Sequence, residues 1–387
     1  MRASVVISAV VAVLVGFGGS VAIILAAAKA VDASAAETSS WVSALCFAIA
    51  AITGILCLRH RMPIVAAWST PGAAIIAAST GITIEAAVGA FVLAGVLLTL
   101  TAAIRPLGQL IEKIPTAIAS AMLAGVLFDF VVAVWGYAQT DWMLVLPLLA
   151  TFLVLRLFSP SWAVIVVLVV GVVLAHALGM AKPVGGFEMS SLLWITPSWE
   201  PAVLIGLGIP LYLVTMASQN LPGFAVLRAA EYQVPSRSIL TVAGLASLAT
   251  SVFGAHASNL AAISASICTG PDAHPDKDKR WMCGPVYALY YVGLGFFGAS
   301  VVTLFASFPE ALIITVAGVA LTGPLVGALS SAMDASGDRF VAVTTFVVTA
   351  SGITAFGIGA AFWGLVVGLI AHGLRIGFER ARGDVAP

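Results

Sequence analysis

Three polar residues stand near the start of a short apolar stretch, FGAHASNLAAISASICTG, which runs from Phe253 to Gly270. His256, Ser258 and Asn259 have side chains that can hold a small anion by hydrogen bonding, and an imidazole can also carry a proton. The part that follows His256 is too short to cross about 30 Å of hydrocarbon comfortably as a helix. The role of these residues therefore depends on the segments that surround them.

A second stretch, AAWSTPGAAIIAAST, has a similar character. Ser69 and Thr70 are residue types that favour the N-cap of a helix, and Pro71 suits its first turn. This pattern predicts extended backbone over 64–69 and a half-helix over 71–79. Part of each such membrane segment is then non-helical, which is tolerated only where the backbone lines protein or a watery cavity.

The two half-helices together predict a binding site. In the stretch that contains His256, Ser258 or Asn259 would cap a second half-helix over 259–268, after a break at Gly254. A helix N-terminus carries roughly +0.5 elementary charge, so two that face each other can bind an anion without a fixed cation. The simpler interpretation, ordinary helix caps at the membrane surface, stays open. The candidate substrate-binding residues in these segments are Ser69, Thr70, Gly72, His256, Ser258, Asn259 and Leu260.

A pair of adjacent amides adds two further substrate-binding candidates. Gln219 and Asn220 close an apolar segment in the sequence MASQNLPGF, directly before a break at Pro222. Their side chains could bind the oxygen atoms of a ligand. They could equally satisfy backbone carbonyl groups that the proline leaves without a partner.

Proton transfer would need an ionisable group within the membrane, and such groups are rare. Asp129 lies in GVLFDFVVAVWG, about four turns into its segment. We expect either proton coupling or a neutral hydrogen bond between helices. His256 is the other proton-coupling candidate, unless it is a buried structural histidine. The four cysteines lack metal-site or disulfide spacing, and enzyme motifs are missing, so we expect no metal, cofactor or catalytic site.

The composition predicts a polytopic α-helical membrane protein. Of 387 residues, 61% are hydrophobic and 9% are charged, and the net charge of zero gives no sign of a nucleic-acid partner. The third and tenth of fourteen apolar segments are short. The predicted segments are 4–28, 41–58, 63–79, 84–103, 114–136, 142–157, 160–179, 201–219, 238–254, 258–269, 284–306, 309–333, 339–356 and 359–378.

The positive charges predict the orientation of these segments. If the N-terminus is cytoplasmic, all of the 17 basic residues except Lys29 and Lys182 lie on the cytoplasmic side. If the third segment did not cross the membrane, Arg105 and Lys113 would lie on the outer side. If the tenth segment did not cross, Arg339 would lie there. Both short segments are therefore predicted to complete crossings, and both termini are predicted to be cytoplasmic.

Weak internal similarity predicts a repeat. The sequence AVLVGFGGSVAIILAAA (12–28) lies over AVLIGLGIPLYLVTMAS (202–218), and STPGAAI (69–75) lies over ASNLAAI (257–263). A third pair, IPTAIASAMLAGV over FPEALIITVAGVA, follows in the same order. Seven segments per half is an odd number, so the second half must enter the membrane from the opposite side. The predicted fold class is an all-α membrane protein with 14 transmembrane segments as a 7+7 inverted repeat, the architecture of alternating-access transporters.

Three motifs, SQNLPGF, WSTPGAA and GAHASNLAAISASICTG, resemble the bacterial benzoate membrane transport family of benzoate–proton symporters. That family is similar to nucleobase symporters and sulfate permeases. The resemblance implies a homodimer in which a core domain moves like an elevator against a gate domain. The implied core comprises 1–103 and 201–306, and the implied gate comprises 104–180 and 307–387.

One departure from these relatives bears on the substrate. The nucleobase symporters carry glutamates in the eighth and tenth segments, where this chain offers Gln219 or Asn220 and Ser258 or Asn259. The loss of carboxylates suits a substrate that is itself a carboxylate, since like charges repel. We therefore expect uptake of benzoate or a similar small aromatic carboxylate with a proton across the bacterial inner membrane, with the ring packed against apolar walls such as Trp68 and Phe253.

Two other classes of function stay open. The same paired half-helices could serve an exchanger or channel for inorganic or other organic anions. A receptor would bind the ligand without moving it, and an intramembrane enzyme is disfavoured by the missing motifs.

Overall fold

The computed structural model describes residues 2–18, 20–104, 115–158, 160–183, 186–261, 263–271, 273–334, 336–356 and 360–382. Arg105 and Lys113, which the charge argument used, and the junction 105–114 at the start of the expected gate domain lie outside the described residues.

The first half of the chain contains long helices interrupted by one very short strand. Its elements are α1 (Ala3–Val13), the π-helical turn η1 (Leu14–Gly18), α2 (Val21–Ala30), α3 (Ala35–His60), β1 (Ala66–Trp68), α4 (Thr70–Ala77), α5 (Ile84–Ala103), α7 (Thr116–Thr140), α8 (Trp142–Phe158) and α9 (Pro160–Ala177).

The second half repeats this order of elements, including the short strand. It contains α10 (Pro201–Val203), η2 (Leu204–Gly208), α11 (Ile209–Thr215), η3 (Met216–Asn220), α12 (Leu221–Ala229), α13 (Ser236–Ser251), β2 (Ser258–Leu260), α14 (Ile263–Thr269), η4 (Lys277–Met282), α15 (Cys283–Phe296), α16 (Gly298–Ala306), α17 (Glu310–Met333), η5 (Ser336–Asp338), α18 (Arg339–Ala350) and α19 (Ala360–Arg382).

Each of the fourteen predicted segments contains a helix. Among the described residues, seven helices are long and apolar enough to cross a membrane, and α15 with α16, bent by 62° at their junction, would make an eighth. These lengths and compositions define a multi-pass membrane protein. The number of crossings predicted from the sequence is larger, because it counts α8, α9, α13, α18 and the two half-helices as well.

The two short segments meet in a feature that the all-α prediction missed. β1 and β2 form an antiparallel pair, with Ala67 opposite Asn259. Two further bonds extend the pairing, from Ala261 N to Val65 O at 2.9 Å and from Ser69 N to Ala257 O at 3.0 Å. Each broken segment thus satisfies the backbone of the other, which a hydrocarbon environment requires.

The first half-helix agrees with its prediction, and the second begins later than predicted. The Oγ atom of Ser69 caps α4 by accepting from Gly72 N at 3.2 Å, as the residue types predicted. By contrast, Ser258 and Asn259 belong to β2, and α14 begins only at Ile263. The prediction of Ser258 or Asn259 as an N-cap was therefore wrong, because strand pairing uses this backbone.

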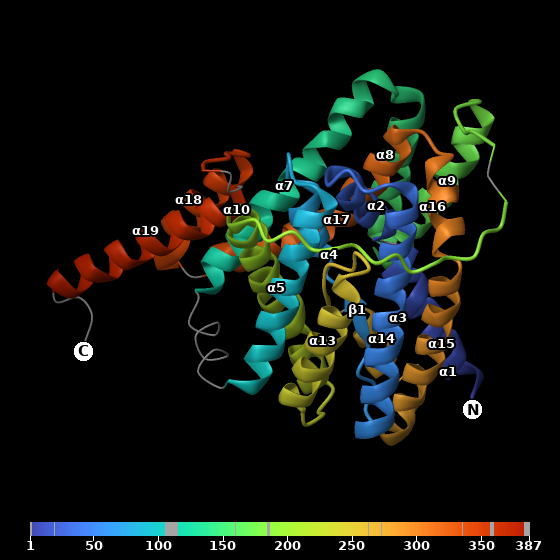
Figure 1. Cartoon of the computed structure of the whole chain (residues 1–387), viewed down its shortest axis with the longest axis horizontal. Helices are drawn as coiled ribbons and strands as arrows, with labels where there is room; N and C mark the ends of the chain where they lie inside the picture. The colour runs from blue at the N-terminus through green and yellow to red at the C-terminus, as the bar shows by residue number, and fades with distance from the viewer. Residues whose placement is uncertain are drawn as a thin grey trace.

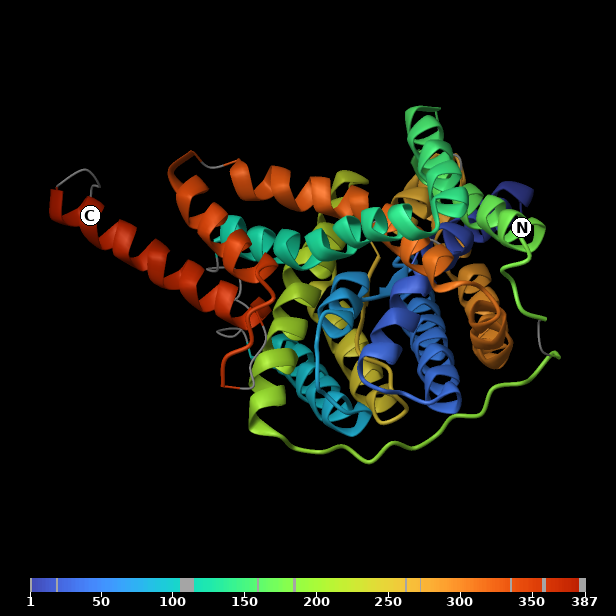
Figure 2. The same ribbon diagram turned by 90° about the horizontal axis from the view of Figure 1, so that it is seen from above.

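The helices form two groups with different directions. In Figure 1, α3, α5, α13 and α15 stand side by side around the strand pair, whereas α7 slopes across them. Figure 2 shows α7 and α17 lying alongside each other above this group, and α19 projecting from one end of the molecule. The close packing of α17 with α7, α13 with α5 and α15 with α3 gives each group its core.

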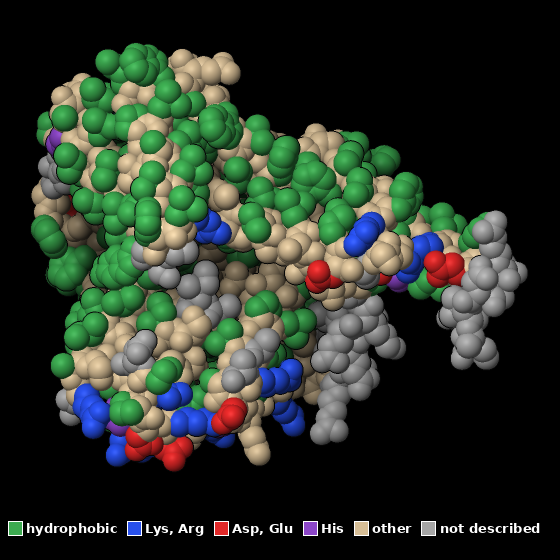
Figure 3. All heavy atoms as spheres, turned by 180° about the vertical axis from the view of Figure 1, so that it is seen from behind, with side chains coloured by type: hydrophobic (Ala, Val, Ile, Leu, Met, Phe, Trp, Pro, Cys, Tyr) green, Lys and Arg blue, Asp and Glu red, His purple; other side chains and the backbone are tan. Residues whose placement is uncertain are grey.

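The surface agrees with a protein that sits in a bilayer. Figure 3 shows hydrophobic side chains over most of one face, with charged side chains gathered along one edge and on the projecting end. A long extended segment after α9 crosses in front of the upright helices in Figure 1, runs along the lower edge of Figure 2 and leads to α10. It is tied down by hydrogen bonds such as Ile195 N to Val252 O at 2.8 Å and Ser198 N to Glu85 O at 2.9 Å.

The crossing of α5 and α13 yields a stability prediction. A Cβ atom on Gly244 of α13 would lie 2.7 Å from the backbone nitrogen of Thr99 in α5. We expect Gly244→Ala to destabilise the protein by about 1–3 kcal/mol, because the two backbones must separate. The thermal unfolding midpoint in detergent measures this. Gly293→Ala is the control, since nothing lies within 4 Å of its Cβ position, and an equal loss there would contradict the packing argument.

Candidate functional site

A cavity of about 670 Å³ opens beside the strand pair. It is bounded by η1, α4, α7, η3, α12 and α17, and most of its wall is apolar. None of the described residues that line it has an ionisable side chain. Its polar side chains are Ser20, Thr70, Thr116, Ser120, Ser218, Gln219, Ser264 and Ser331.

The sequence candidates divide into two groups in this structure. Thr70 and Gln219 line the cavity. The other candidates are buried behind its wall and do not line it; they are Ser69, Gly72, Asn220, His256, Ser258, Asn259 and Leu260. Most of the polar residues that mark the breaks in the sequence therefore brace the backbone around the cavity.

Ser69 connects the bracing groups. Besides capping α4, its Oγ accepts a hydrogen bond from Thr215 Oγ1 at 2.8 Å. Its carbonyl oxygen lies 2.9 Å from Nε2 of His256. The residue is fully buried. Ser69 thus ties α4 to α11 and to the segment before β2.

His256 is held on both ring nitrogens. The indole N–H of Trp41 donates to its Nδ1 at 3.1 Å, and an indole can only donate. Nδ1 therefore carries no proton, and Nε2 donates to the carbonyl oxygen of Ser69. The histidine is a neutral, fully buried bridge. This geometry favours the structural role that the sequence left open.

The amide of Asn220 supports β2. Its Oδ1 accepts from Leu260 N at 3.0 Å, and its Nδ2 donates to Thr215 O at 3.3 Å. Gln219, its neighbour in sequence, faces the cavity and forms no side-chain hydrogen bond to another described residue. Of this amide pair, Asn220 therefore satisfies backbone groups, and Gln219 is the one that is placed to contact a ligand.

The remaining residues of the strand are also hydrogen bonded. Oriented to suit its neighbours, the Asn259 amide accepts from Ser69 N at 3.1 Å and donates to Leu260 O at 2.9 Å. The backbone N–H of Ser258 donates to Ser247 Oγ at 2.9 Å. The hydroxyl of Ser258 is buried without a partner in the described structure.

Trp68 forms an aromatic wall of the cavity. Its indole N–H donates to Ser20 Oγ at 2.7 Å, which fixes the ring. The ring centroid lies 5.3 Å from that of Phe17 and 6.4 Å from that of Tyr291. Of the two wall residues predicted from the sequence, Trp68 lines the cavity and Phe253 does not.

The sequence analysis did not identify several of the hydroxyl groups that line the cavity. Ser20, Ser120 and Ser264 stand among small apolar residues, where a helix-packing hydroxyl looks the same, and Ser218 directly precedes the amide pair. In the structure, a glycine leaves room for one of these hydroxyls. A Cβ on Gly16 would lie 2.9 Å from Ser264 Oγ, so this glycine leaves room for the serine.

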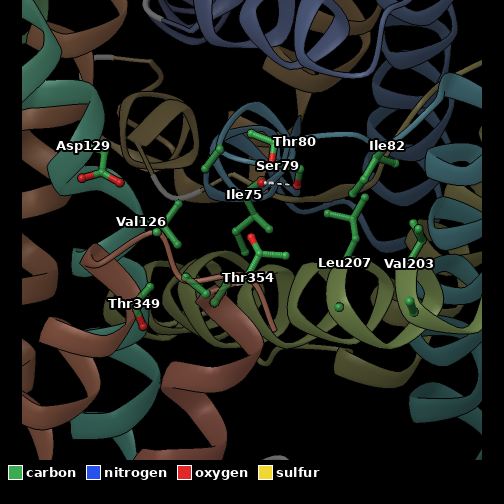
Figure 4. A pocket seen from close by; sticks show the side chains of 16 residues that line it. Ile75, Ser79, Thr80, Ile82, Val126, Asp129, Val203, Leu207, Thr349 and Thr354 are labelled. Carbon is green, nitrogen blue, oxygen red and sulfur yellow. Dashed lines mark hydrogen bonds between the residues drawn. The ribbon is translucent and has the colours of Figure 1, made fainter. Parts of the chain in front are cut away.

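Asp129 lies away from this cavity. It lines a separate, smaller cavity of about 100 Å³ at the other end of α4. Figure 4 shows Asp129 on α7 on one side of that space, with Ser79 and Thr80 near its middle and Thr349 on α18.

The fold of the chain is similar to those of two solved membrane proteins. Its structure resembles the transmembrane domain of a cyanobacterial bicarbonate transporter, BicA, with a TM-score of 0.61 at 13% identity, covering 95% of this chain and 97% of that one. It also resembles SLC26A9, with a TM-score of 0.66 at 12% identity, covering 96% of this chain and 65% of that one.

The chain belongs to the BenE family, described as benzoate membrane transport protein, whose model matches residues 1–374. It is 38% identical over 363 residues to inner membrane protein YdcO of Escherichia coli (strain K12), covering 93% of each chain. It is 35% identical over 372 residues to the benzoate membrane transport protein of Acinetobacter baylyi (strain ATCC 33305 / BD413 / ADP1), covering 95% of this chain and 94% of that one. The family is one of membrane transporters and not of enzymes.

The different environments of Asn220 and Gln219 yield a prediction. Asn220→Ala leaves the backbone N–H of Leu260 buried without its acceptor, so we expect a loss of about 1–3 kcal/mol in stability. Gln219→Ala should leave the thermal unfolding midpoint unchanged and alter only ligand binding. Thermal unfolding of both variants in detergent, beside wild type, makes the comparison. Equal midpoints for Asn220→Ala and wild type would contradict the bracing role of Asn220.

Proposed function

We propose that this protein is a secondary active transporter that takes up benzoate or a similar small aromatic carboxylate with a proton across the bacterial inner membrane. The observation that carries the proposal is an uncharged cavity with an aromatic wall, lined by hydroxyls at the N-terminus of α4. Membership of the BenE family and the names of the two bacterial relatives support the substrate class and the membrane.

The carboxylate would bind at the N-terminus of α4. There Pro71 has no N–H and the N–H of Gly72 is already capped by Ser69, which leaves the Thr70 hydroxyl as the best-placed donor. The positive end of the helix dipole adds to this. The Ser264 hydroxyl also lines the cavity, but it donates its proton to Ala12 O at 3.1 Å and therefore offers a ligand only lone pairs.

The aromatic ring would pack on Trp68. Its indole is fixed by Ser20 and by neighbouring aromatic rings, so little order is lost when a planar ligand stacks on it. The cavity volume falls within the range of small-molecule sites, which are mostly apolar with a few placed polar groups.

The transport mechanism that we propose is an elevator-like movement of a core domain, 1–103 and 201–306, against a gate domain, 104–180 and 307–387, in a homodimer. It assumes fourteen crossings as a 7+7 inverted repeat with both termini in the cytoplasm. In support, β1 and β2 join the third and tenth segments as symmetry-related parts would. The likeness to BicA and SLC26A9 supports the overall fold.

For the proton we favour Asp129 over His256. The imidazole already uses both nitrogens in hydrogen bonds, so charging it would break the bond from Trp41. The carboxyl of Asp129 has no hydrogen bond to another described residue, which leaves it free to exchange a proton.

A second candidate is an exchanger or channel for inorganic or other organic anions. The uncharged hydroxyl lining favours it, since such a cavity binds any small anion weakly. The structural likeness to a bicarbonate transporter is compatible with this alternative in fold. Proton dependence separates the two, because a channel needs no proton gradient.

Uptake of labelled benzoate into proteoliposomes tests the proposal. We expect accumulation that depends on an inward proton gradient. In Thr70→Val, which keeps the shape of the side chain, loss of one hydrogen bond to a charged ligand should weaken binding about 10-fold or more.

Thr241→Val is the matched control, since this threonine lies on α13 outside both cavities and bonds only within its helix. Uptake that ignores the proton gradient would reject symport and favour the exchanger or channel. Normal affinity in Thr70→Val would reject the proposed carboxylate position.

A further inference from the structure

We propose that the large cavity recognises a second polar group on its ligand, and that its preferred ligands are aromatic carboxylates with a hydroxyl group on the ring. The residues that would bind this second group are Thr116, Ser120 and Ser331. The inference rests on the proposed function for the positions of the carboxylate and the ring. It adds the residues that would discriminate among aromatic acids.

The polar side chains of this cavity differ from hydroxyls elsewhere on the same helices. On α17, the hydroxyls of Thr315 and Thr322 donate to the carbonyl oxygens four residues earlier, at 2.6 and 3.1 Å. Six side chains that line the cavity form no hydrogen bond to another described residue. Because polar groups in apolar surroundings need partners, these six are available to a ligand or to water. They are Thr70, Ser218, Gln219, Thr116, Ser120 and Ser331.

Three of the six lie together at the start of α4. The Thr215 hydroxyl donates to Ser69 Oγ at 2.8 Å, which joins the segment before η3 to the residue directly before α4. Thr70 follows that serine in the chain. Ser218 and Gln219 lie within about one helical turn of Thr215. These three side chains form the group that would contact the carboxylate.

The other three lie where α7 begins and α17 ends. Figure 2 shows these two helices alongside each other. Ala117 and Ala121 of α7 belong to one small buried cluster with Ala332 of α17 and Ala342 of α18, so the start of α7 lies close to the end of α17. The residue directly before each of the first three alanines is one of the three hydroxyls, and all three line the cavity. They form a second polar group, on helices other than those that carry the first.

A ligand that satisfies both groups needs two polar ends and an apolar part. Trp68 and other apolar residues make up most of the remaining wall, which suits an aromatic ring. A ring hydroxyl can donate and accept, as serine and threonine hydroxyls can, so the two match. A second carboxylate would lose its hydration without compensation, because no described residue of the wall is ionisable. The cavity of about 670 Å³ also has room for a substituted ring.

The two polar groups belong to different parts of the proposed mechanism. Thr70 and Gln219 lie in the proposed core domain, whereas Ser120 and Ser331 lie in the proposed gate domain. A ligand that contacts both groups would bridge the two domains and slow its own release. Binding at equilibrium therefore tests the inference more directly than uptake does.

Isothermal titration calorimetry on the full-length protein in detergent provides the test. The ligands are benzoate, 3-hydroxybenzoate and 4-hydroxybenzoate, with 3-methylbenzoate and 4-methylbenzoate as controls of nearly equal size. We expect at least one hydroxy acid to bind roughly 2- to 10-fold more tightly than the methyl acid with the same ring position, which is the effect of one net hydrogen bond.

The combined variant Ser120→Ala and Ser331→Ala should lose this preference. Its affinity for benzoate should stay unchanged, which also shows that the variant is folded. Ser330→Ala is the matched control, because Ser330 is the neighbour of Ser331 but is exposed and lies outside the cavity. This control should keep the wild-type preference.

Three results would overturn the inference and leave the proposed function standing. Wild type could bind benzoate but bind each hydroxy acid no more tightly than its methyl counterpart. The preference could persist in the combined variant, or that variant could lose affinity for all five acids alike. If wild type binds none of the acids, the proposed substrate class itself fails, and the inference fails with it.

Discussion

Everything in this structure depends on how two segments that change from a strand to a short helix satisfy their backbone. Helices that stop within hydrocarbon leave N–H and C=O groups without partners, and each such group is costly. β1 and β2 solve this for each other by pairing antiparallel, with Trp68 opposite Ser258. The pair joins segments almost 200 residues apart, so neither break is possible without the other. The half-helices and the cavity between them follow from that pairing.

A strand pair of three residues each is too short to be stable alone, so side chains must brace it. Ser247, Asn220 and Tyr287 bond to its backbone from three different helices. His256 and Trp41 extend this network to α3. Because these groups are fully occupied, they fix the position of the α4 N-terminus and leave ligand contact to other hydroxyls. This need for side-chain hydrogen bonds to the strand pair explains why so many polar residues lie within otherwise apolar segments.

The sequence predicted what depends on local chemistry. Hydropathy predicted α5 over its observed range, and Ser69 with Pro71 predicted the start of α4. The sequence-based prediction failed where the structure of a segment depends on residues far away in the chain. Nothing near Ser258 indicates that Ala66–Trp68 will pair with it, so its polar neighbours resembled a helix cap. For the same reason Gln219 and Asn220 could not be separated, since only β2 shows which amide bonds to backbone. Isolated serines such as Ser264 carry no local sign of the cavity that they line.

Under the proposed function, Asp129 explains how a cavity without charged side chains could take part in uphill transport. A cavity with a fixed cation would bind a carboxylate strongly and release it slowly, whereas hydroxyls and a helix dipole bind it weakly. Asp129 lines the cavity at the other end of α4, whose eight residues span about 12 Å. Two like unit charges about 12 Å apart repel by about 1.4 kcal/mol at an effective dielectric constant of about 20. Protonation of Asp129 would remove such a repulsion between its carboxylate and that of the substrate, which corresponds to about a tenfold gain in affinity. The affinity of a cavity without a fixed cation would then rise when the proton binds and fall when it leaves.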